Sequence, residues 1–332
     1  MRHGAPDARG RESGTRLRAG VIINPYSSGM TAKRELAIVR TLREHMDLEV
    51  RRTERGGHAP KLAQELLEAG DLDVIIACGG DGTANEVLNG MELADDTAAA
   101  RPRVAILPSG GTNVVARALG YVNHPVRATK QLVTGILEGH TRTINLATMD
   151  ERTFLFAAGV GLDGEVVKRM EMRRTGRRPS DTAHVAALVG IYASSRFALG
   201  DRMTIRVTDT GEELRAAMLM VGNSTPLTYV GRMPLHLMPD CTFEGGLDFI
   251  APHRANVALV LRNASAALGM ARRATAAKRD EASQLHHDVR RFVVECDDPQ
   301  PVQVDGEYAG DRTRIEFGLV ERAVRLVVPT PA

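Results

Sequence analysis

The stretch Val74–Gly90, VIIACGGDGTANEVLNG, decides the fold that the sequence predicts. Its first residues, Val74–Cys78, are apolar and rich in β-branched side chains, which is typical of a strand buried on both faces of a parallel sheet. Glycines follow at once, and they let the backbone turn sharply and approach a bulky anion. Thr83 and Glu86 then match a capping box, with Thr83 as the N-cap. The stretch therefore predicts a strand, a glycine turn and a helix N-terminus that binds phosphate.

Asp81 lies inside this glycine turn, where a carboxylate would repel a bare phosphate. A cation between the two groups removes the repulsion, so Asp81 indicates a Mg²⁺–nucleotide as the ligand. A turn that only connects a strand to a helix is the alternative, because such turns are common in α/β proteins.

Two other turns of this kind follow predicted strands. Leu17–Ile23 is a strand-like run that leads into Asn24–Gly29, and Val104–Leu107 leads into Pro108–Asn113. The carboxyl ends of neighbouring parallel strands lie at one edge of a sheet, so the three turns are expected to converge there. Their convergence favours a ligand site more strongly than any single turn does.

The sequence GGDGTANEVLNG resembles the signature of the diacylglycerol kinase catalytic-domain family, which is related to the sphingosine kinases and more distantly to the NAD kinases. The resemblance extends over about Arg18–Pro329 and includes an NPxSG-like turn at 24–29. It implies ATP and Mg²⁺ as cofactors. The nucleotide-binding residues that it implies are Asn24, Pro25, Ser27, Ser28, Gly29, Thr53, Gly79, Gly80, Asp81, Gly82, Thr83, Asn85, Glu86, Gly110, Gly111, Thr112 and Asn113.

Two of the departures from the family pattern remove acids. Val114 and Asn145 stand where the family usually has acids, so part of its charged network is absent. A lipid kinase is the interpretation that the resemblance favours. A regulator of the same fold that binds nucleotide or lipid without catalysis is the alternative.

The character of the chain changes at about Thr141, where short β-like runs separated by turn residues become typical of an antiparallel sandwich. Among these runs are Thr153–Ala158, Arg290–Cys296 and Val302–Val304. Helical patterns at His184–Leu199 and Asn256–Leu268 interrupt these runs, and His286–Asp288 is interpreted as a solvated loop. C-terminal residues are expected to complete the first domain, as in the resembling family. The predicted division is a disordered leader at 1–16, an α/β nucleotide-binding domain with a parallel sheet at 17–140, and a mainly antiparallel β-sandwich domain for the lipid substrate at 141–328.

Carboxylates in the second half are candidates for proton transfer and metal binding. Asp305 and the next glycine form a hairpin-type dipeptide, and a plain hairpin is its simplest interpretation. The resembling family has its proposed general base in a DGE segment here, which implies Asp305 first and Glu307 second. Asp81 completes the predicted catalytic set. Glu244 and Asp248 resemble part of a family segment that holds a structural divalent ion, so they join Asp81 as predicted metal ligands, with a solvated turn as the alternative.

Gly159–Gly164 matches a GxGxxG pattern and suggests an NAD(P)-binding oxidoreductase as a further alternative. The pattern lies mid-chain, and the segments after it do not alternate as βαβ units. The resembling family has a GxGxD segment at this place, which accounts for the pattern without a dinucleotide.

Composition narrows the class of partner. The formal net charge is +2, aromatic residues make up 4% and tryptophan is absent, so nucleic acid is not an expected partner. The three cysteines are too scattered for a disulfide framework, which fits a reducing cytosol. No apolar stretch reaches membrane-spanning length. Basic runs at Lys168–Arg178 and 272–279 predict contact with an anionic membrane surface.

The sequence therefore predicts a cytoplasmic, peripherally membrane-associated kinase that uses ATP and Mg²⁺ to phosphorylate a lipid hydroxyl. Diacylglycerol, converted to phosphatidic acid, is the first candidate substrate. Sphingoid bases, ceramide and other glycerolipids stay open as acceptors, and a homodimer stays open as the assembly.

Overall fold

The computed structural model describes residues 16–91, 101–172, 200–253 and 284–330. The predicted leader and the helices expected at 184–199 and 256–268 lie outside these ranges, apart from residue 16. The basic run at 272–279 and most of the basic run at 168–178 also lie outside the described residues.

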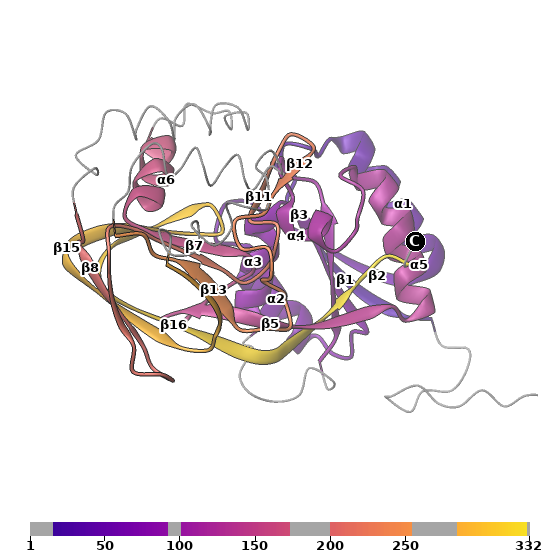
Figure 1. Cartoon of the computed structure of the whole chain (residues 1–332). Coiled ribbons are helices and arrows are strands. Elements are labelled where there is room, and N and C mark those ends of the chain that lie inside the picture. Colours follow the sequence, from indigo (N-terminus) through magenta and orange to yellow (C-terminus); the bar gives the residue numbers. More distant parts are fainter. Residues whose placement is uncertain (1–15, 92–100, 173–199, 254–283, 331–332) are drawn as a thin grey trace, which may run out of the picture.

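The first half is an α/β structure around four parallel strands in the order β2-β1-β3-β4. All six residues of β3 are buried at the centre of this arrangement. Helix α1 packs with α5 and α2 packs with α3, on opposite sides of the strands in Figure 1. The elements are β1 (Arg18–Ile23), α1 (Ala32–His45), β2 (Asp47–Arg52), α2 (Ala59–Glu68), β3 (Val74–Gly79), α3 (Asp81–Gly90), β4 (Arg103–Pro108), α4 (Val114–Ala118) and α5 (Pro125–Glu138).

The second half is mainly antiparallel and β-rich, as predicted. Its core is built around four phenylalanines, of which Phe292 stacks on Phe317 at 5.0 Å and lies 4.8 Å from Phe249. The elements are β5 (Thr141–Met149), β6 (Arg152–Phe154), β7 (Ala157–Val160), α6 (Leu162–Met172), β8 (Met203–Val207), β9 (Glu213–Ala216), β10 (Leu219–Gly222), β11 (Thr228–Val230), β12 (Met233–Leu235), β13 (Leu247–Ile250), β14 (Leu285–Val289), β15 (Phe292–Val304) and β16 (Glu307–Val327).

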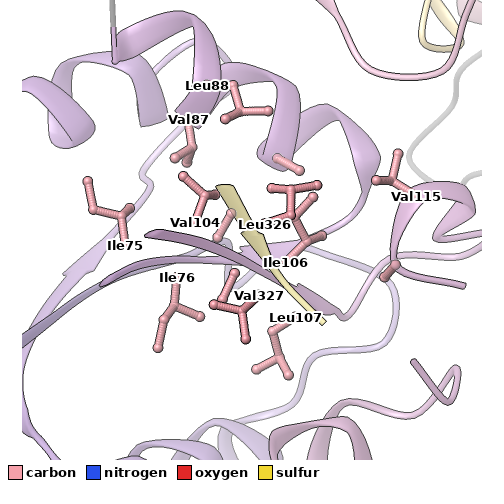
Figure 2. Packing of buried hydrophobic residues seen from close by; sticks show 14 of the residues in the cluster. Ile75, Ile76, Val87, Leu88, Val104, Ile106, Leu107, Val115, Leu326 and Val327 are labelled. Atoms are coloured by element: carbon pink, nitrogen blue, oxygen red, sulfur yellow. The ribbon is translucent and has the colours of Figure 1, made fainter. Parts of the chain in front are cut away.

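Strand β16 joins the two halves into one sheet. It pairs antiparallel with β15 and β5, and its end, at Leu326, pairs parallel with Val104 of β4. Figure 1 shows this strand in yellow, running from the β-rich half into the α/β half. Leu326 and Val327 are fully buried; in Figure 2, Leu326 lies beside Val104 and Ile106, and Val327 lies beside Ile76 and Leu107. The last residues of the chain thus complete the core of the first half.

Several predictions of strands and loops differ from the structure. The run predicted at Thr153–Ala158 is split into β6 and β7, because the N–H groups between them turn toward a buried carboxylate described below. Two separate runs predicted at 290–296 and 302–304 belong to the single strand β15. The loop predicted at His286–Asp288 is wrong, since these residues lie in β14, where His286 stacks on Phe249 at 4.5 Å.

Candidate active site

The three glycine turns of the first half meet at one edge of the parallel strands. Asn24 Nδ2 donates to Thr83 Oγ1 at 3.1 Å, which joins the turn after β1 to α3. Ser27 Oγ lies 2.8 Å from Ser109 Oγ, and the N–H of Gly29 donates to the Ser109 carbonyl at 2.7 Å. The convergence predicted from strand order is therefore present.

The residues predicted to bind nucleotide lie in or beside turns at the carboxyl ends of β1 to β4. Asn24, Pro25, Ser27, Ser28 and Gly29 follow β1, Thr53 follows β2, Gly79, Gly80, Asp81, Gly82, Thr83, Asn85 and Glu86 run from β3 into α3, and Gly110, Gly111, Thr112 and Asn113 follow β4. Thr53 is buried, and its N–H donates to the Ile23 carbonyl at 2.9 Å.

Two glycines at this edge are required because neighbouring atoms lie too close for any larger residue. A methyl group added at Gly79 would lie 2.3 Å from the side chain of Thr83, and one at Gly110 would lie 2.6 Å from the Cα of Gly80. Both distances are far shorter than a van der Waals contact, so larger residues would force the turns apart. The glycines therefore keep the turns in contact.

Asp81 joins the glycine turn to the next helix. Its Oδ2 accepts the N–H of Val114 at 2.9 Å and its Oδ1 accepts the N–H of Val115 at 3.0 Å, at the first turn of α4. A carboxylate is favourable at a helix N-terminus, because the peptide dipoles are aligned there. The sequence interpretation considered only a cation as the partner of Asp81 and missed these backbone donors.

The predicted capping box of α3 is wrong. The helix begins at Asp81 with Gly80 as its N-cap, and no side chain caps it. Glu86 accepts instead the N–H groups of Gly57 at 2.9 Å and Ala59 at 3.2 Å. Glu86 therefore stabilises the turn before α2, and the first turn of α3 keeps its N–H groups directed at the edge where the glycine turns meet.

Asp305 lies in a buried site made of hydrogen-bond donors. Its Oδ2 accepts from Asn85 Nδ2 at 2.7 Å and from the N–H of Leu155 at 2.8 Å. Its Oδ1 accepts the N–H groups of Phe156 at 3.0 Å and Ala157 at 3.2 Å. Burial raises the pKa of Asp305 to about 6, although the three backbone N–H groups oppose the shift. Four donors occupy the acceptor positions that a carboxylate offers.

Glu307 lies on the side of the same turn that faces the first half. Its Oε1 is 2.6 Å from the position that a methyl group on Gly82 would take, so it lies against the first turn of α3. Its Oε2 is 3.2 Å from Nη2 of Arg152. The side chain is 39% exposed, whereas Asp305 is buried. Glu307 is thus the more accessible carboxylate of the predicted pair.

Asn85 and Asn89 connect α3 to the second half. Asn85 Nδ2 donates to the Thr153 carbonyl at 3.0 Å as well as to Asp305. Asn89 Nδ2 donates to the same carbonyl at 3.1 Å, and its Oδ1 accepts the N–H of Thr153 at 3.0 Å. Asn85, predicted to bind nucleotide, therefore positions β6. The prediction missed Asn89, although its spacing of four from Asn85 places both on one helix face.

Gln303 supports the turn that carries both carboxylates. Its Nε2 donates to Asp163 Oδ2 at 2.6 Å, and its Oε1 accepts the N–H of Gly306 at 2.9 Å. Asp163 belongs to the GxGxxG pattern, so this pattern contributes to the turn. β7 pairs antiparallel with both β10 and β15, which is not the parallel βαβ unit that a dinucleotide site requires.

The acidic turn at Glu244 and Asp248 does not fit a metal ion in this structure. Glu244 forms an ion pair with Arg142 through both carboxylate oxygens. Asp248 Oδ1 accepts from His287 Nδ1 at 2.7 Å and from the N–H of Asp288 at 3.1 Å. Side-chain cations and donors thus take the place of a divalent ion. Within the described residues, no group of three or more His, Cys, Asp or Glu side chains could hold a metal.

Comparisons with known proteins agree with this architecture. Residues 18–149 match the model of the diacylglycerol kinase catalytic domain. The chain is 27% identical to a diacylglycerol kinase of Bacillus subtilis over 94% of this chain and 96% of that protein. It is 34% identical to a diacylglycerol kinase of Staphylococcus aureus, over 44% of each chain.

Solved structures show the same fold. A putative diacylglycerol kinase from Bacillus anthracis matches with a TM-score of 0.71 and 21% identity, covering 96% of this chain and 99% of that one. A second structure described in the same way gives a TM-score of 0.68 with the same identity and coverage.

The converging glycine turns, the two-part fold and the named relatives define the class of this protein as a lipid kinase. Residues 18–149 match the diacylglycerol kinase catalytic domain, and nearly the whole chain is similar to a bacterial diacylglycerol kinase. In the part of the chain that the structure describes, no helix is both long and apolar enough to cross a membrane.

Proposed function

We propose that the protein transfers the terminal phosphoryl group of Mg²⁺–ATP to a lipid hydroxyl, with diacylglycerol as the first candidate acceptor and phosphatidic acid as the product. The relatives named as diacylglycerol kinases support this acceptor. The observation that carries the proposal is the position of Glu307 against Gly82, because it brings an exposed carboxylate to the turn that suits phosphate.

The donor phosphates bind at the first turn of α3. This helix has ten residues and a glycine N-cap without a capping side chain, so its N-terminal N–H groups and dipole favour an anion. Asp81 is half-buried at the same edge. Magnesium is commonly held by one or two carboxylates together with substrate phosphates, so Asp81 is proposed as the residue that would hold it, while its oxygens also accept the N–H groups of Val114 and Val115. When bound there, the ion would neutralise phosphate charge.

Glu307 is the proposed general base. The hydroxyl oxygen of the acceptor attacks the terminal phosphorus, its proton passes to the Glu307 carboxylate, and the bond from phosphorus to the nucleoside diphosphate oxygen breaks. Asp305 was the first candidate from sequence, but its four hydrogen bonds direct both oxygens into the protein. Asp305 is therefore proposed as the residue that positions the turn.

A non-catalytic binding protein is the second candidate. Val114 and Asn145, which replace acids of the family pattern, are both buried. Asn145 Nδ2 donates to the carbonyls of Glu244 and Gly245 at 3.0 Å, and its Oδ1 accepts the N–H of Arg322 at 2.8 Å. This asparagine connects loops and supplies no charge, which favours a structural role at that position.

The test is transfer of labelled phosphate from ATP to a panel of lipids in mixed micelles. We expect transfer to diacylglycerol, and a loss of about 10²–10⁴-fold in kcat for Glu307→Gln, which is the usual contribution of a positioned base. Glu316→Gln is the matched control, because Glu316 pairs with Arg291 on an exposed part of β16. ATP binding without transfer to any lipid would favour the second candidate.

The proposed acceptor lies in a bilayer, so we also propose peripheral membrane contact. Two cations of the first basic run are engaged within the protein, since Lys168 pairs with Asp311 and Arg169 with Glu165. Support for this contact therefore comes from the substrate class more than from the described surface. Sedimentation with anionic and neutral vesicles at low salt tests it, and equal binding to both would contradict an electrostatic contact.

A further inference from the structure

Arg152 is a cation that the nucleotide-binding and carboxylate predictions did not include. It is the first residue of β6, and its Nη2 lies 3.2 Å from Oε2 of Glu307. The two side chains are 36% and 39% exposed, so both reach solvent where the halves meet. The other oxygen of Glu307 lies against Gly82. The Glu307 carboxylate therefore contacts both the guanidinium and the first turn of α3.

The backbone beneath Arg152 is fixed to the same helix. The adjacent residue, Thr153, exchanges hydrogen bonds with Asn89 in both directions, and its carbonyl also accepts from Asn85. These asparagines lie on α3, whose first turn is the proposed phosphate site. The position of Arg152 relative to that turn is thus set by three hydrogen bonds one residue away, and does not depend on a flexible loop.

The guanidinium has capacity for a further anion. It carries five N–H donors in a planar fork that suits phosphate and carboxylate. Among the described residues, the guanidinium of Arg152 makes one hydrogen bond, from its Nη2 to Oε2 of Glu307. An exposed ion pair of this kind contributes only about 0–1 kcal/mol to stability, so stability alone gives little reason for it at this position.

We propose that Arg152 is a catalytic residue of the phosphoryl transfer. Its guanidinium contacts the terminal phosphoryl group held at the first turn of α3 and orients Glu307 toward the acceptor hydroxyl. The Arg152 guanidinium offsets the negative charge of that phosphoryl group and also that of the Glu307 carboxylate beside it. This inference rests on the proposed kinase function, and adds to it the cation on the acceptor side.

The test compares Arg152→Met and Arg152→Lys with Arg215→Met. Arg215 is a matched control, because it pairs with Asp297 at 2.7 Å, the two side chains are 39% and 52% exposed, and it lies on β9 away from the glycine turns. We expect Arg152→Met to lower kcat about 10²–10³-fold, a typical loss for one transition-state donor. Arg152→Lys should retain part of the rate, since it keeps the charge but not the fork. Arg215→Met should keep the rate within about twofold, as expected for an exposed pair.

A second measurement separates this inference from the kinase function itself. Binding of ATP and of ADP to each variant is titrated without lipid, with melting temperature as a check of folding. We expect Arg152→Met to weaken ATP binding about tenfold and to leave ADP binding unchanged, because ADP lacks the phosphate that Arg152 contacts. This selective loss would support the role of Arg152 even in a wild type that transfers phosphate to no lipid. Equal rates and equal ATP affinities for the Arg152→Met and Arg215→Met variants would overturn it while leaving an active kinase intact. A wild type that binds neither nucleotide would overturn both proposals.

Discussion

Asp305 and Glu307 are two residues apart, yet the fold places them in different surroundings. Asp305 has φ 49° and Gly306 has φ 79°, so the chain reverses tightly and the two side chains face different partners. One carboxylate is buried among four donors, and the other is half-exposed beside a cation. The sequence DGE predicts that a hairpin presents carboxylates, but the choice between them depends on the chain between β6 and β7, which is distant in sequence.

The raised pKa of Asp305 predicts a pH-dependent stability. Its folded pKa of about 6 exceeds the ordinary value of 3.8, so the folded protein binds this proton more tightly than the unfolded chain does. Stability from this group is fully present below about pH 4 and is lost as pH rises through about 6. The shift corresponds to about 3 kcal/mol, at 1.36 kcal/mol for each pKa unit.

Urea unfolding of wild type and of Asp305→Asn at pH values from 4 to 7 measures this effect. We expect the stability of wild type relative to the asparagine variant to fall by most of that amount across the range, because the variant does not titrate. If the difference in unfolding free energy between the two proteins does not change with pH, the hydrogen-bond donors around Asp305 offset the cost of burying its charge.

At the scale of elements, the contact between α3 and β6 determines how the two halves of the site face each other. The Thr153 carbonyl accepts hydrogen bonds from Asn85 and Asn89 on one face of α3, and its N–H donates to Asn89. The first turn of the same helix borders the proposed phosphate site. A shift of β6 would therefore move Arg152 and Glu307 relative to the glycine turns. The helix acts as the common support of donor and acceptor groups.

Asn89→Ala tests that support. The substitution removes two hydrogen bonds to the Thr153 backbone and leaves its N–H without that partner. Leaving such groups unpaired costs about 1–3 kcal/mol in stability, and we expect the lipid-transfer rate to fall with it. The control is Thr134→Ala, whose hydroxyl donates to the Lys130 carbonyl on an exposed face of α5. Chemical denaturation of both variants gives the comparison, and equal stabilities would show that β6 is held by packing alone.

The sequence predicts the elements of the first half well, because local patterns determine them. Val74–Cys78 is apolar and Gly79 begins a tight turn, so the strand, the turn and the following helix are all visible in a short window. The capping box was predicted wrongly because Glu86 is occupied by the turn at 57–59, which local spacing does not reveal. The boundaries of β6 and β7 were missed for a related reason, since Asp305 draws the N–H groups between them from 150 residues away.

At the scale of the whole molecule, β16 makes the two halves depend on each other. This strand has 21 residues, begins at Glu307 in the candidate site and ends in the core of the first half. The hydroxyl of Tyr121 donates to the Val327 carbonyl at 2.9 Å, which fixes the end of the strand to the segment between α4 and α5. Sequence predicted that C-terminal residues complete the first domain only through a resemblance, since no local pattern shows which strands pair.

Leu326→Ala tests whether this strand couples the two halves. Leu326 is fully buried beside Val104 and Ile106, as Figure 2 shows, so its removal leaves a cavity in the first half. We expect a loss of about 2–5 kcal/mol in the free energy of unfolding. Leu36→Ala is the control, because Leu36 is 71% exposed, and the same change there should cost less than about 0.5 kcal/mol.

Amide hydrogen exchange in β3 and β15 gives the decisive readout for Leu326→Ala. If the sheet unfolds as one unit, protection falls by the same free energy in both strands, although β15 lies in the other half. Protection that falls in β3 and stays unchanged in β15 would mean that the halves are stable independently. In that case the distance between Glu307 and Gly82 would be set by the contact of α3 with β6, and not by the continuity of the sheet.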